Sequence, residues 1–221
     1  MLAKDLVAYF IPPVTETDSV KQILDRMTEL KISHLPVVMN AAYQGIIAES
    51  DLGVFPDQEV IINSKSIEFI NVSVIEDQHI YEVIDLVSRY NLTLIPVLSA
   101  TGEYKGSITL PVLVRNFSSL TAAGEPGAIL VLNIAPQDYS PNIISRIIEE
   151  NNAKMISLYM RQDPNNPELT VTIKINTQET SSIIRSFDRY GYSVKSYFLA
   201  NSQLDDFYRS RYEEFMKYMN I

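Results

Sequence analysis

Side chains suited to catalysis or metal binding are scarce in this sequence. Cysteine is absent, which excludes disulfides, thiol catalysis and thiolate metal sites. The two histidines, His34 and His79, are isolated from each other, and Glu149 and Glu150 are expected at the solvated end of a helix. Neither the P-loop pattern nor the glycine pattern of dinucleotide-binding folds occurs. With no nucleophile–base pair visible, we expect a protein that is not an enzyme and that requires no cofactor or metal.

The composition is that of an ordinary globular protein, with 46% hydrophobic and 20% charged residues in a chain of 221. The net charge is −9, the isoelectric point is near 4.7, and no basic stripe occurs, so no nucleic-acid partner is expected. The first ten residues, MLAKDLVAYF, are too short and too acidic for a signal peptide. No apolar run reaches membrane-spanning length. These features predict a cytoplasmic protein with no membrane partner.

A pattern that occurs twice organises the first half of the chain. Residues 33–51, SHLPVVMNAAYQGIIAESD, are matched about 60 residues later by residues 93–112, TLIPVLSATGEYKGSITLPV. Pro96 corresponds to Pro36, and one additional residue in the second turn places Gly106 opposite Gly45. Because internal repeats decide the fold class, this match is the main structural signal. Each copy is expected to form a strand, a turn, a second strand and the start of a helix.

An amphipathic helix is predicted before each copy, because apolar residues recur at helical spacing. Thr17 or Asp18 is the expected N-cap of the first helix. The sequence therefore predicts two β-α-β-β-α units in tandem, at about residues 1–60 and 61–120. The expected core stripes are Val20, Ile23, Leu24, Met27 and Leu30 in the first unit and Ile80, Val83, Ile84, Val87 and Tyr90 in the second.

These units resemble a pair of cystathionine-β-synthase-type (CBS) domains, known together as a Bateman module. The resemblance covers roughly residues 2–120 and rests on His34-Leu35-Pro36-Val37 and on Gly45-Ile46-Ile47, with Asp51 six residues after the glycine. Many members bind adenosine nucleotides between the repeats through the pattern Gly-h-h-Thr/Ser-x-x-Asp/Asn, where h is hydrophobic. The hydroxyl reaches phosphate at a helix N-terminus, where free N–H groups favour an anion. The acid accepts hydrogen bonds from the ribose hydroxyls.

Each unit supplies only part of that pattern. The first has Asp51 but carries Ala48 at the hydroxyl position, and the second has Thr109 but carries Val112 at the acid position. The resemblance implies a regulatory nucleotide, AMP, ADP or ATP, with AMP favoured. The alternative for His34 is a strand-edge histidine bonded to backbone, and the alternative for Asp51 is an ordinary first-turn aspartate. The ligand-binding residues that the resemblance implies are Asp51, Thr109, His34, Leu35, Pro36, Thr15, Ile95 and Pro96.

A different order of elements follows a turn-rich linker at residues 121–127. Residues 128–200 predict the ferredoxin-like order βαββαβ. Ser140 is the expected N-cap of the first helix, with Pro141 at its first position. Asn176 or Thr177 is the expected N-cap of the second helix. In the strand between them, residues 169–175 alternate apolar and polar side chains, which predicts one buried face and one wet face that includes Lys174.

This second segment resembles an ACT domain, a regulatory module that often binds amino acids between paired copies. That family has an Asp-x-x-Gly turn before the first helix, and here the turn runs from Asp138 to Pro141, with proline at the glycine position. Residues 201–221 predict an amphipathic helix with an aromatic stripe. The order of the two modules resembles the acetoin-utilisation B-type proteins.

The predicted fold class is therefore α/β and α+β, with tandem β-α-β-β-α CBS repeats, a βαββαβ ACT-like domain and a C-terminal helix. The predicted domains are residues 1–120, 128–200 and 201–221, with a linker at 121–127. The leading hypothesis is a non-catalytic sensor that binds an adenine nucleotide and forms a homodimer. One alternative is a ligand-free dimerisation scaffold that acts on an unidentified client protein, which Ala48, Val112 and Pro141 favour. The other alternative is a protein that binds an amino acid at the ACT-like interface.

Overall fold

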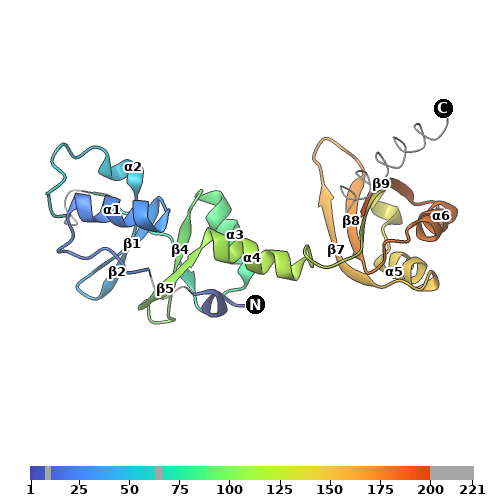
Figure 1. The fold of residues 1–221 in the computed structure, drawn as a ribbon, viewed down its shortest axis with the longest axis horizontal. Helices are drawn as coiled ribbons and strands as arrows, with labels where there is room; N and C mark the ends of the chain where they lie inside the picture. The colour runs from blue at the N-terminus through green and yellow to red at the C-terminus, as the bar shows by residue number, and fades with distance from the viewer. Residues whose placement is uncertain (8–10, 63–66, 200–221) are drawn as a thin grey trace, which may run out of the picture. The chain divides into compact units, whose positions relative to one another are not determined.

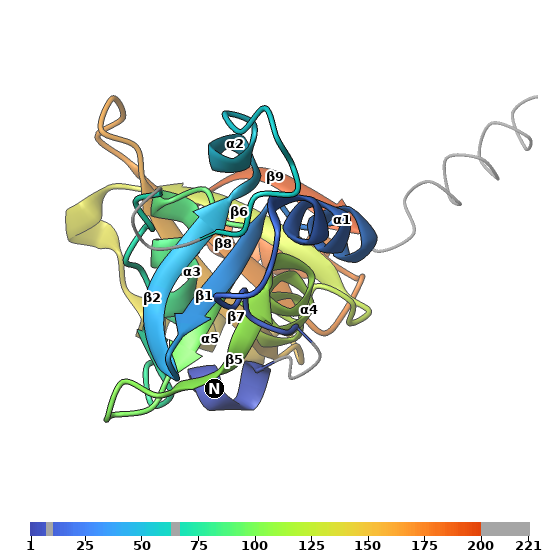
Figure 2. The same ribbon diagram turned by 90° about the vertical axis from the view of Figure 1, so that its left-hand side faces the viewer.

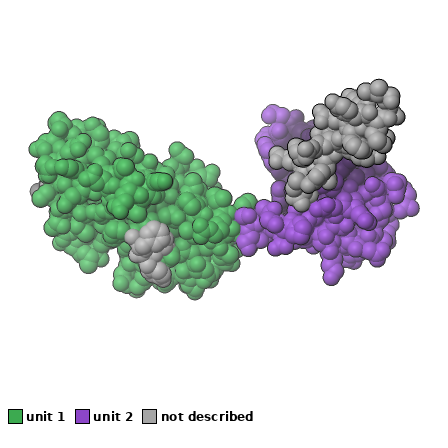
Figure 3. Space-filling model, in the orientation of Figure 1, with its two compact units in different colours: residues 1–117 green, residues 118–221 purple. Residues whose placement is uncertain are grey.

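The computed structural model describes residues 1–7, 11–62 and 67–199 (Figure 1). The chain folds into two compact units, residues 1–117 and 118–221 (Figure 3). The first unit contains both repeats, and the second contains the βαββαβ segment. The predicted C-terminal helix, residues 201–221, lies outside the described residues.

The first unit contains two copies of one hairpin, each preceded and followed by a helix (Figure 2). Strand β3 extends the second hairpin by pairing in parallel with β4. The elements are η1 (Ala3–Leu6), α1 (Val20–Leu30), β1 (His34–Met39), β2 (Ala42–Ala48), α2 (Glu49–Leu52), β3 (Val74–Ile75), α3 (Ile80–Arg89), β4 (Leu94–Leu98), β5 (Tyr104–Thr109) and α4 (Leu110–Leu120).

The two hairpins have the same register. Val37 lies opposite Gly45 in the first hairpin, and Val97 lies opposite Gly106 in the second, and each strand pair bulges directly after this position. The additional residue in the second turn is therefore absorbed without moving the strands, as the sequence predicts.

Helix α1 begins at a different cap from the one predicted. Ser19 is the N-cap: its hydroxyl accepts the N–H of Gln22 at 3.4 Å, and Oε1 of Gln22 accepts the N–H of Ser19 at 2.8 Å. This reciprocal capping box satisfies two backbone donors at once. Asp18 is engaged elsewhere, because its Oδ2 accepts the N–H of Thr15 at 2.7 Å. The prediction of Thr17 or Asp18 as the cap is therefore wrong.

The two repeats share their hydrophobic cores. Leu94 of the second repeat is buried in the core around α1 and β1, and Ile46 of the first repeat is buried in the core around α3 and β4. The N-terminal segment also joins the second repeat, because the N–H of Ala3 bonds to the C=O of Gln78 at 2.9 Å. Each core is incomplete without the other repeat, so we treat the pair as one folding unit.

Gly45 allows the segment between the repeats to pass close to β2. Its φ is +142°, and a Cβ at this position would lie 2.8 Å from the carbonyl oxygen of Ile70. Ile46 and Ile70 exchange backbone hydrogen bonds of 2.9 and 3.0 Å beside it. Only glycine fits this conformation and this close approach without strain.

The second unit is a four-stranded sheet in the order β7-β8-β6-β9. All of its pairings are antiparallel, which is the ferredoxin-like arrangement that the sequence predicts. Helices α5 and α6 lie on the same face of the sheet (Figure 1). Its elements are β6 (Ala128–Ile134), η2 (Pro136–Asp138), α5 (Pro141–Glu150), β7 (Met155–Gln162), β8 (Leu169–Ile175), α6 (Ser181–Arg189) and β9 (Ser193–Leu199).

One of the two caps predicted for this unit is correct. Ser140 caps α5, and Pro141 is its first residue. Helix α6 begins later than predicted, after Thr180. Asn176 and Thr177 are instead used in the loop, where Oδ1 of Asn176 accepts the N–H of Lys154 at 2.7 Å and Oγ1 of Thr177 accepts the N–H of Glu179 at 3.1 Å. The prediction of Asn176 or Thr177 as the cap is therefore wrong.

Candidate functional site

The two strand-to-helix junctions at which the sequence places a ligand are built alike. The N–H of Glu49 donates to the C=O of Ser33, and the N–H of Leu110 donates to the C=O of Thr93, each at 3.0 Å. Each bond ties the start of a helix to the start of its own hairpin. The junctions therefore differ in side chains while their backbones are equivalent.

His34 links the two hairpins. The N–H of Thr93 donates to Nδ1 of His34 at 3.3 Å, and the Thr93 hydroxyl lies 3.0 Å from the same nitrogen. That hydroxyl also accepts the N–H of Ser33 at 3.0 Å. Because Nδ1 accepts a backbone N–H, we assign the proton of the neutral ring to Nε2. His34 is thus bonded to backbone, as the alternative interpretation of the sequence expects, and Nε2 is the donor left for a ligand.

The protonation of His34 depends on its surroundings and on Asp51. Burial lowers the pKa of His34 from its ordinary value, and the negative charge of Asp51 opposes part of this shift. The structure therefore brings two of the predicted ligand residues within electrostatic reach of each other.

Asp51 lies in the short helix α2, which has four residues. Its Oδ2 accepts the N–H of Ala48 at 3.1 Å, and its Oδ1 lies 3.5 Å from the hydroxyl of Ser50. The carboxylate therefore closes the start of the helix, the role expected of an ordinary first-turn aspartate. Oδ1 makes the longer contact and is the atom better placed to accept a ribose hydroxyl.

The other predicted strand residues have buried side chains. Leu35 and Ile95 belong to the first and second cores, and Pro36 and Pro96 are buried in the same strands. Thr109, the last residue of β5, is also buried. A ligand at the junctions would therefore meet the backbone of these strands more than their side chains.

Thr15 belongs to a polar network at the start of the first repeat. Its hydroxyl donates to Oδ2 of Asp18 at 3.1 Å, and Oδ1 of Asp18 accepts Nη2 of Arg26 at 2.7 Å. Nη1 of Arg26 donates to the C=O of Pro13 at 3.0 Å. The side chains of Arg26 and Asp18 are only 19% and 16% exposed. This network holds Thr15 in place without a ligand.

A cavity of about 490 Å³ lies beside His34 where the two repeats meet. The first repeat contributes Ser33, His34 and residues 48–50, and the second contributes Tyr90 and Asn91. Asp51 follows this wall directly in the chain. Of the described residues, no lysine or arginine lines the cavity, whereas Glu49 does. The cavity is therefore a polar space between the repeats with negative charge in its wall.

Tyr90 and Asn91 are the site residues that the sequence analysis missed. Tyr90 is predicted in the core stripe of its helix, but it is 46% exposed, because α3 ends at Arg89 and Tyr90 is its C-cap. Asn91 follows with a φ of +51°. An exposed aromatic ring can stack on a nucleobase. Comparison of the two repeats carries the missing signal, since the position of Tyr90 is Leu30 in the first repeat.

The turn before α5, where an ACT-like ligand is expected, is closed by internal contacts. The N–H of Asp138 bonds to the C=O of Ala135 at 2.9 Å, and the Tyr192 hydroxyl donates to the C=O of Asp138 at 3.0 Å. Ser140 accepts the N–H of Ile143 at 3.4 Å. These contacts use backbone groups that would otherwise receive the charged ends of an amino acid.

Across residues 1–7, 11–62 and 67–199, no three His, Asp or Glu side chains are grouped so that they could hold a metal ion. None of the helices in these segments combines the length and the apolarity needed to cross a membrane.

Comparisons with known proteins give one family match and several similar solved structures. The family model of the CBS domain matches residues 3–52. A CBS domain pair/ACT domain protein from Thermotoga maritima is 20% identical, with a TM-score of 0.49, over 54% of this chain and 98% of that chain. The CBS domains of a transcriptional regulator from Streptococcus pneumoniae are 19% identical, with a TM-score of 0.46, over 52% of this chain and 98% of theirs.

The protein CBSX2, solved in complex with AMP, is 17% identical with a TM-score of 0.45, over 53% of this chain and 96% of that chain. The match of the family model to the first repeat and the shared hairpin register of the second lead to one assignment. The first unit is a tandem pair of CBS domains, followed by a βαββαβ domain with the ferredoxin-like fold.

Proposed function

We propose that the first unit is a non-catalytic regulatory module that binds an adenosine nucleotide, with AMP as the favoured ligand. The cavity beside His34 is the observation that carries this proposal, because both repeats line it and Asp51 adjoins it. In this arrangement the purine stacks on Tyr90, the ribose hydroxyls donate to Oδ1 of Asp51, and Nε2 of His34 donates to the phosphate.

The charge of the cavity orders the candidate nucleotides. Glu49 lies in the wall, Asp51 is adjacent, and no lysine or arginine of the described chain lines the space. Each additional phosphate therefore adds repulsion that no cation of the wall offsets. Affinity should fall from AMP to ADP to ATP. S-adenosylmethionine carries a positive sulfonium, so the negative wall of the cavity should attract this group and not repel it.

A ligand in this cavity can act as a signal because it touches both repeats. It shifts the packing of the repeats only if it binds two arrangements with different affinity. The covalent connection to the second unit is α4, of which residues 110–117 belong to the first unit and residues 118–120 to the second. The proposed response is therefore a change in repeat packing that reaches the start of this helix.

Thermal unfolding with AMP, ADP, ATP and S-adenosylmethionine tests the proposal. AMP at a hundred times its dissociation constant should add about 2.7 kcal/mol to the stability of the native state. Asp51→Asn keeps an acceptor for the Ala48 N–H but weakens the ribose contact, so it should remove most of the shift. Asp85→Ala removes an exposed carboxylate that pairs with Arg89 on α3 and should keep the shift. The absence of a shift with every compound at millimolar concentration would contradict nucleotide binding.

A second candidate function, a homodimeric scaffold, is favoured by an apolar groove between α3 and α4. The groove has a volume of about 380 Å³, and Leu110, Val114 and Phe117 in its wall are 43%, 60% and 44% exposed. An apolar face of this kind on a two-helix surface suits a second copy of the same chain. Sedimentation of the wild type, of Val114→Glu and of Val54→Glu tests this function. Only Val114→Glu should dissociate the dimer, because Val54 is exposed outside the groove.

A further inference from the structure

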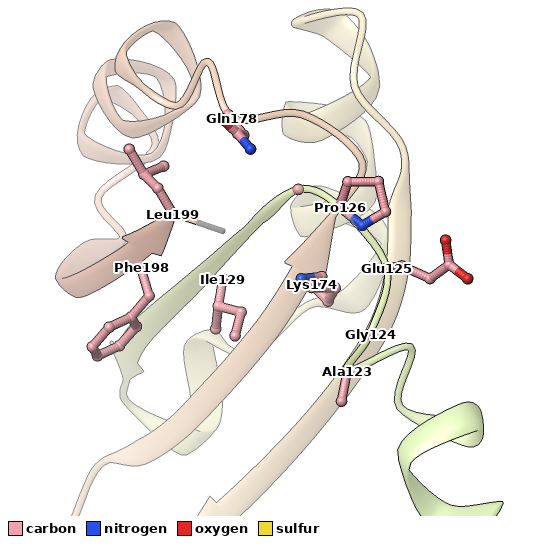
Figure 4. Close-up of a pocket in the computed structure, with 10 residues that line it drawn as sticks. Ala123, Gly124, Glu125, Pro126, Ile129, Lys174, Gln178, Phe198 and Leu199 are labelled. Atoms are coloured by element: carbon pink, nitrogen blue, oxygen red, sulfur yellow. The ribbon is translucent and has the colours of Figure 1, made fainter. Parts of the chain in front are cut away.

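A separate cavity lies in the second unit, on the face of the sheet opposite α5 and α6 (Figure 4). Its volume is about 340 Å³. Residues 123–127 form one side of it, and a row of side chains across the sheet forms the other. In that row Ile129 of β6 is paired with Lys174 of β8 on one side and with Phe198 of β9 on the other.

Lys174 is a buried cation in the wall of this cavity. The alternation of residues 169–175 predicts that Lys174 faces water, but the structure contradicts this, because only 7% of the residue is exposed. In Figure 4, Lys174 lies between Ile129 and the segment formed by residues 123–127.

The ammonium group of Lys174 takes part in none of the ion pairs or side-chain hydrogen bonds found within the described segments. The carboxylate in the wall belongs to Glu125, and in Figure 4 it points away from Lys174. An anion that reaches this ammonium would form a charge-assisted hydrogen bond with it. The wall therefore contains a positive charge that an anionic ligand would satisfy.

Two glycines shape the covering segment. Gly127 has a φ of +141°, and a Cβ there would overlap the carbonyl oxygen of Ile175, so glycine is required for the segment to lie against the end of β8. A Cβ at Gly124 would meet no atom within 4 Å, so this residue borders open space. The segment is thus fixed against the end of β8 at Gly127 and borders open space at Gly124.

We propose that this cavity binds a small monocarboxylate with a short aliphatic chain. The carboxylate pairs with the ammonium of Lys174, and the aliphatic chain packs on Ile129 and Phe198. The volume lies near the lower end of the roughly 300–1,000 Å³ usual for ligand pockets, which favours a small ligand. The site is in the second unit and is independent of the nucleotide cavity.

Calorimetric titration of the full-length protein with 3-methylbutanoate tests this site, with the neutral amide of the same shape, 3-methylbutanamide, as the matched ligand. The acid should bind at least about tenfold more tightly than the amide. Lys174→Met replaces the ammonium with an apolar side chain of similar length, so the variant should fold. Its affinity for 3-methylbutanoate should be at least about tenfold lower than that of the wild type.

The apolar part of the proposal has its own variants. Phe198 and Tyr197 are neighbours of nearly equal exposure, 57% and 53%, but only Phe198 lines the cavity. Phe198→Ala should weaken 3-methylbutanoate about threefold or more, and Tyr197→Ala should leave its affinity unchanged. Equal binding of acid and amide, unchanged binding by Lys174→Met, or no binding of the acid up to about 10 mM would overturn the proposal. Equally tight binding of inorganic phosphate would overturn the preference for a carboxylate.

Discussion

The two CBS repeats have one backbone plan and two sets of side chains. Their hairpins bulge at the same position and are tied to the following helix by the same hydrogen bond. The side chains that could contact a ligand can be compared at three matched positions. At two of them the first repeat is polar and the second is apolar, and at the third the order is reversed. The corresponding pairs are His34 with Leu94, Ala48 with Thr109, and Asp51 with Val112.

The helices after the two hairpins differ as well. Helix α2 has four residues and adjoins the cavity beside His34, whereas α4 has eleven residues and carries an exposed apolar stripe. The first repeat therefore presents a polar site and the second an apolar surface. The comparison teaches that strand register sets the fold of a repeat, while a few side chains at the junction set its chemistry.

Substitution of Gly45 should cause the largest loss of stability, because this glycine belongs to the hairpin register that both repeats share. Gly45→Ala places a Cβ 2.8 Å from the carbonyl oxygen of Ile70 at a φ of +142°. The free energy of unfolding, measured with urea, should fall by about 3 kcal/mol. Gly53→Ala is the matched control, since its φ is −64° and its Cβ would meet Ser50 at an ordinary 3.6 Å. Similar losses in both variants would show that close packing at Gly45 is not the cause.

Breaking the polar network around Thr15 in the first repeat should lower the unfolding free energy more than breaking an exposed ion pair in the second repeat. Asp18→Ala leaves Arg26 without its carboxylate in a site where that side chain is only 19% exposed. The loss in unfolding free energy should be about 2 kcal/mol. The exposed Arg89–Asp85 pair on α3 provides the comparison, and Asp85→Ala should cost no more than about 0.5 kcal/mol. A reversed order of the two losses would contradict the network.

Ala48→Thr should restore the hydroxyl that the first repeat lacks. Ala48 is the N-cap of α2 in an extended conformation, which threonine adopts readily, so the variant should gain about 0.5–1 kcal/mol of stability. A hydrogen bond from this hydroxyl to a charged phosphate should tighten AMP binding about tenfold. Ala48→Val has a similar shape without the hydroxyl and should produce neither gain. Equal effects of the two substitutions would argue against a phosphate contact at this position.

A small pH effect should follow from His34. Its pKa is lowered in the folded protein by burial, so the unfolded chain takes up this proton more readily. The free energy of unfolding should therefore decrease as the pH falls below about 6.5 and should level off once the folded protein is also protonated. His34→Leu copies the residue of the second repeat and should remove this part of the pH dependence. Urea titrations at a series of pH values provide the measurement. The assignment would be wrong if the unfolding free energy of His34→Leu depended on pH in the same way as that of the wild type.

The plan of the fold could be read from the sequence because it depends on local patterns. Pro36 and Pro96, with the matched glycines, fix the strand register of the repeats, and the alternating residues of β8 indicate a half-buried strand. These signals lie within short segments, where the spacing of side chains determines their direction.

Features that depend on distant contacts could not be predicted in this way. Ser19, rather than Asp18, caps α1 because Asp18 pairs with Arg26. Tyr90 is exposed because the chain turns at the end of α3, and Lys174 is buried because residues 123–127 cover it. Contacts with other residues override the local pattern at Asp18 and Lys174, and the end of the helix overrides it at Tyr90.

The most direct test of the central claim is the stoichiometry of AMP binding, measured by calorimetric titration of the full-length protein. The proposed site is the single cavity beside His34, lined by both repeats and adjoined by Asp51, so one AMP should bind per chain and Asp51→Asn should lose that site. Two equivalent sites per chain, or one site that survives Asp51→Asn and is lost in Thr109→Val, would contradict it.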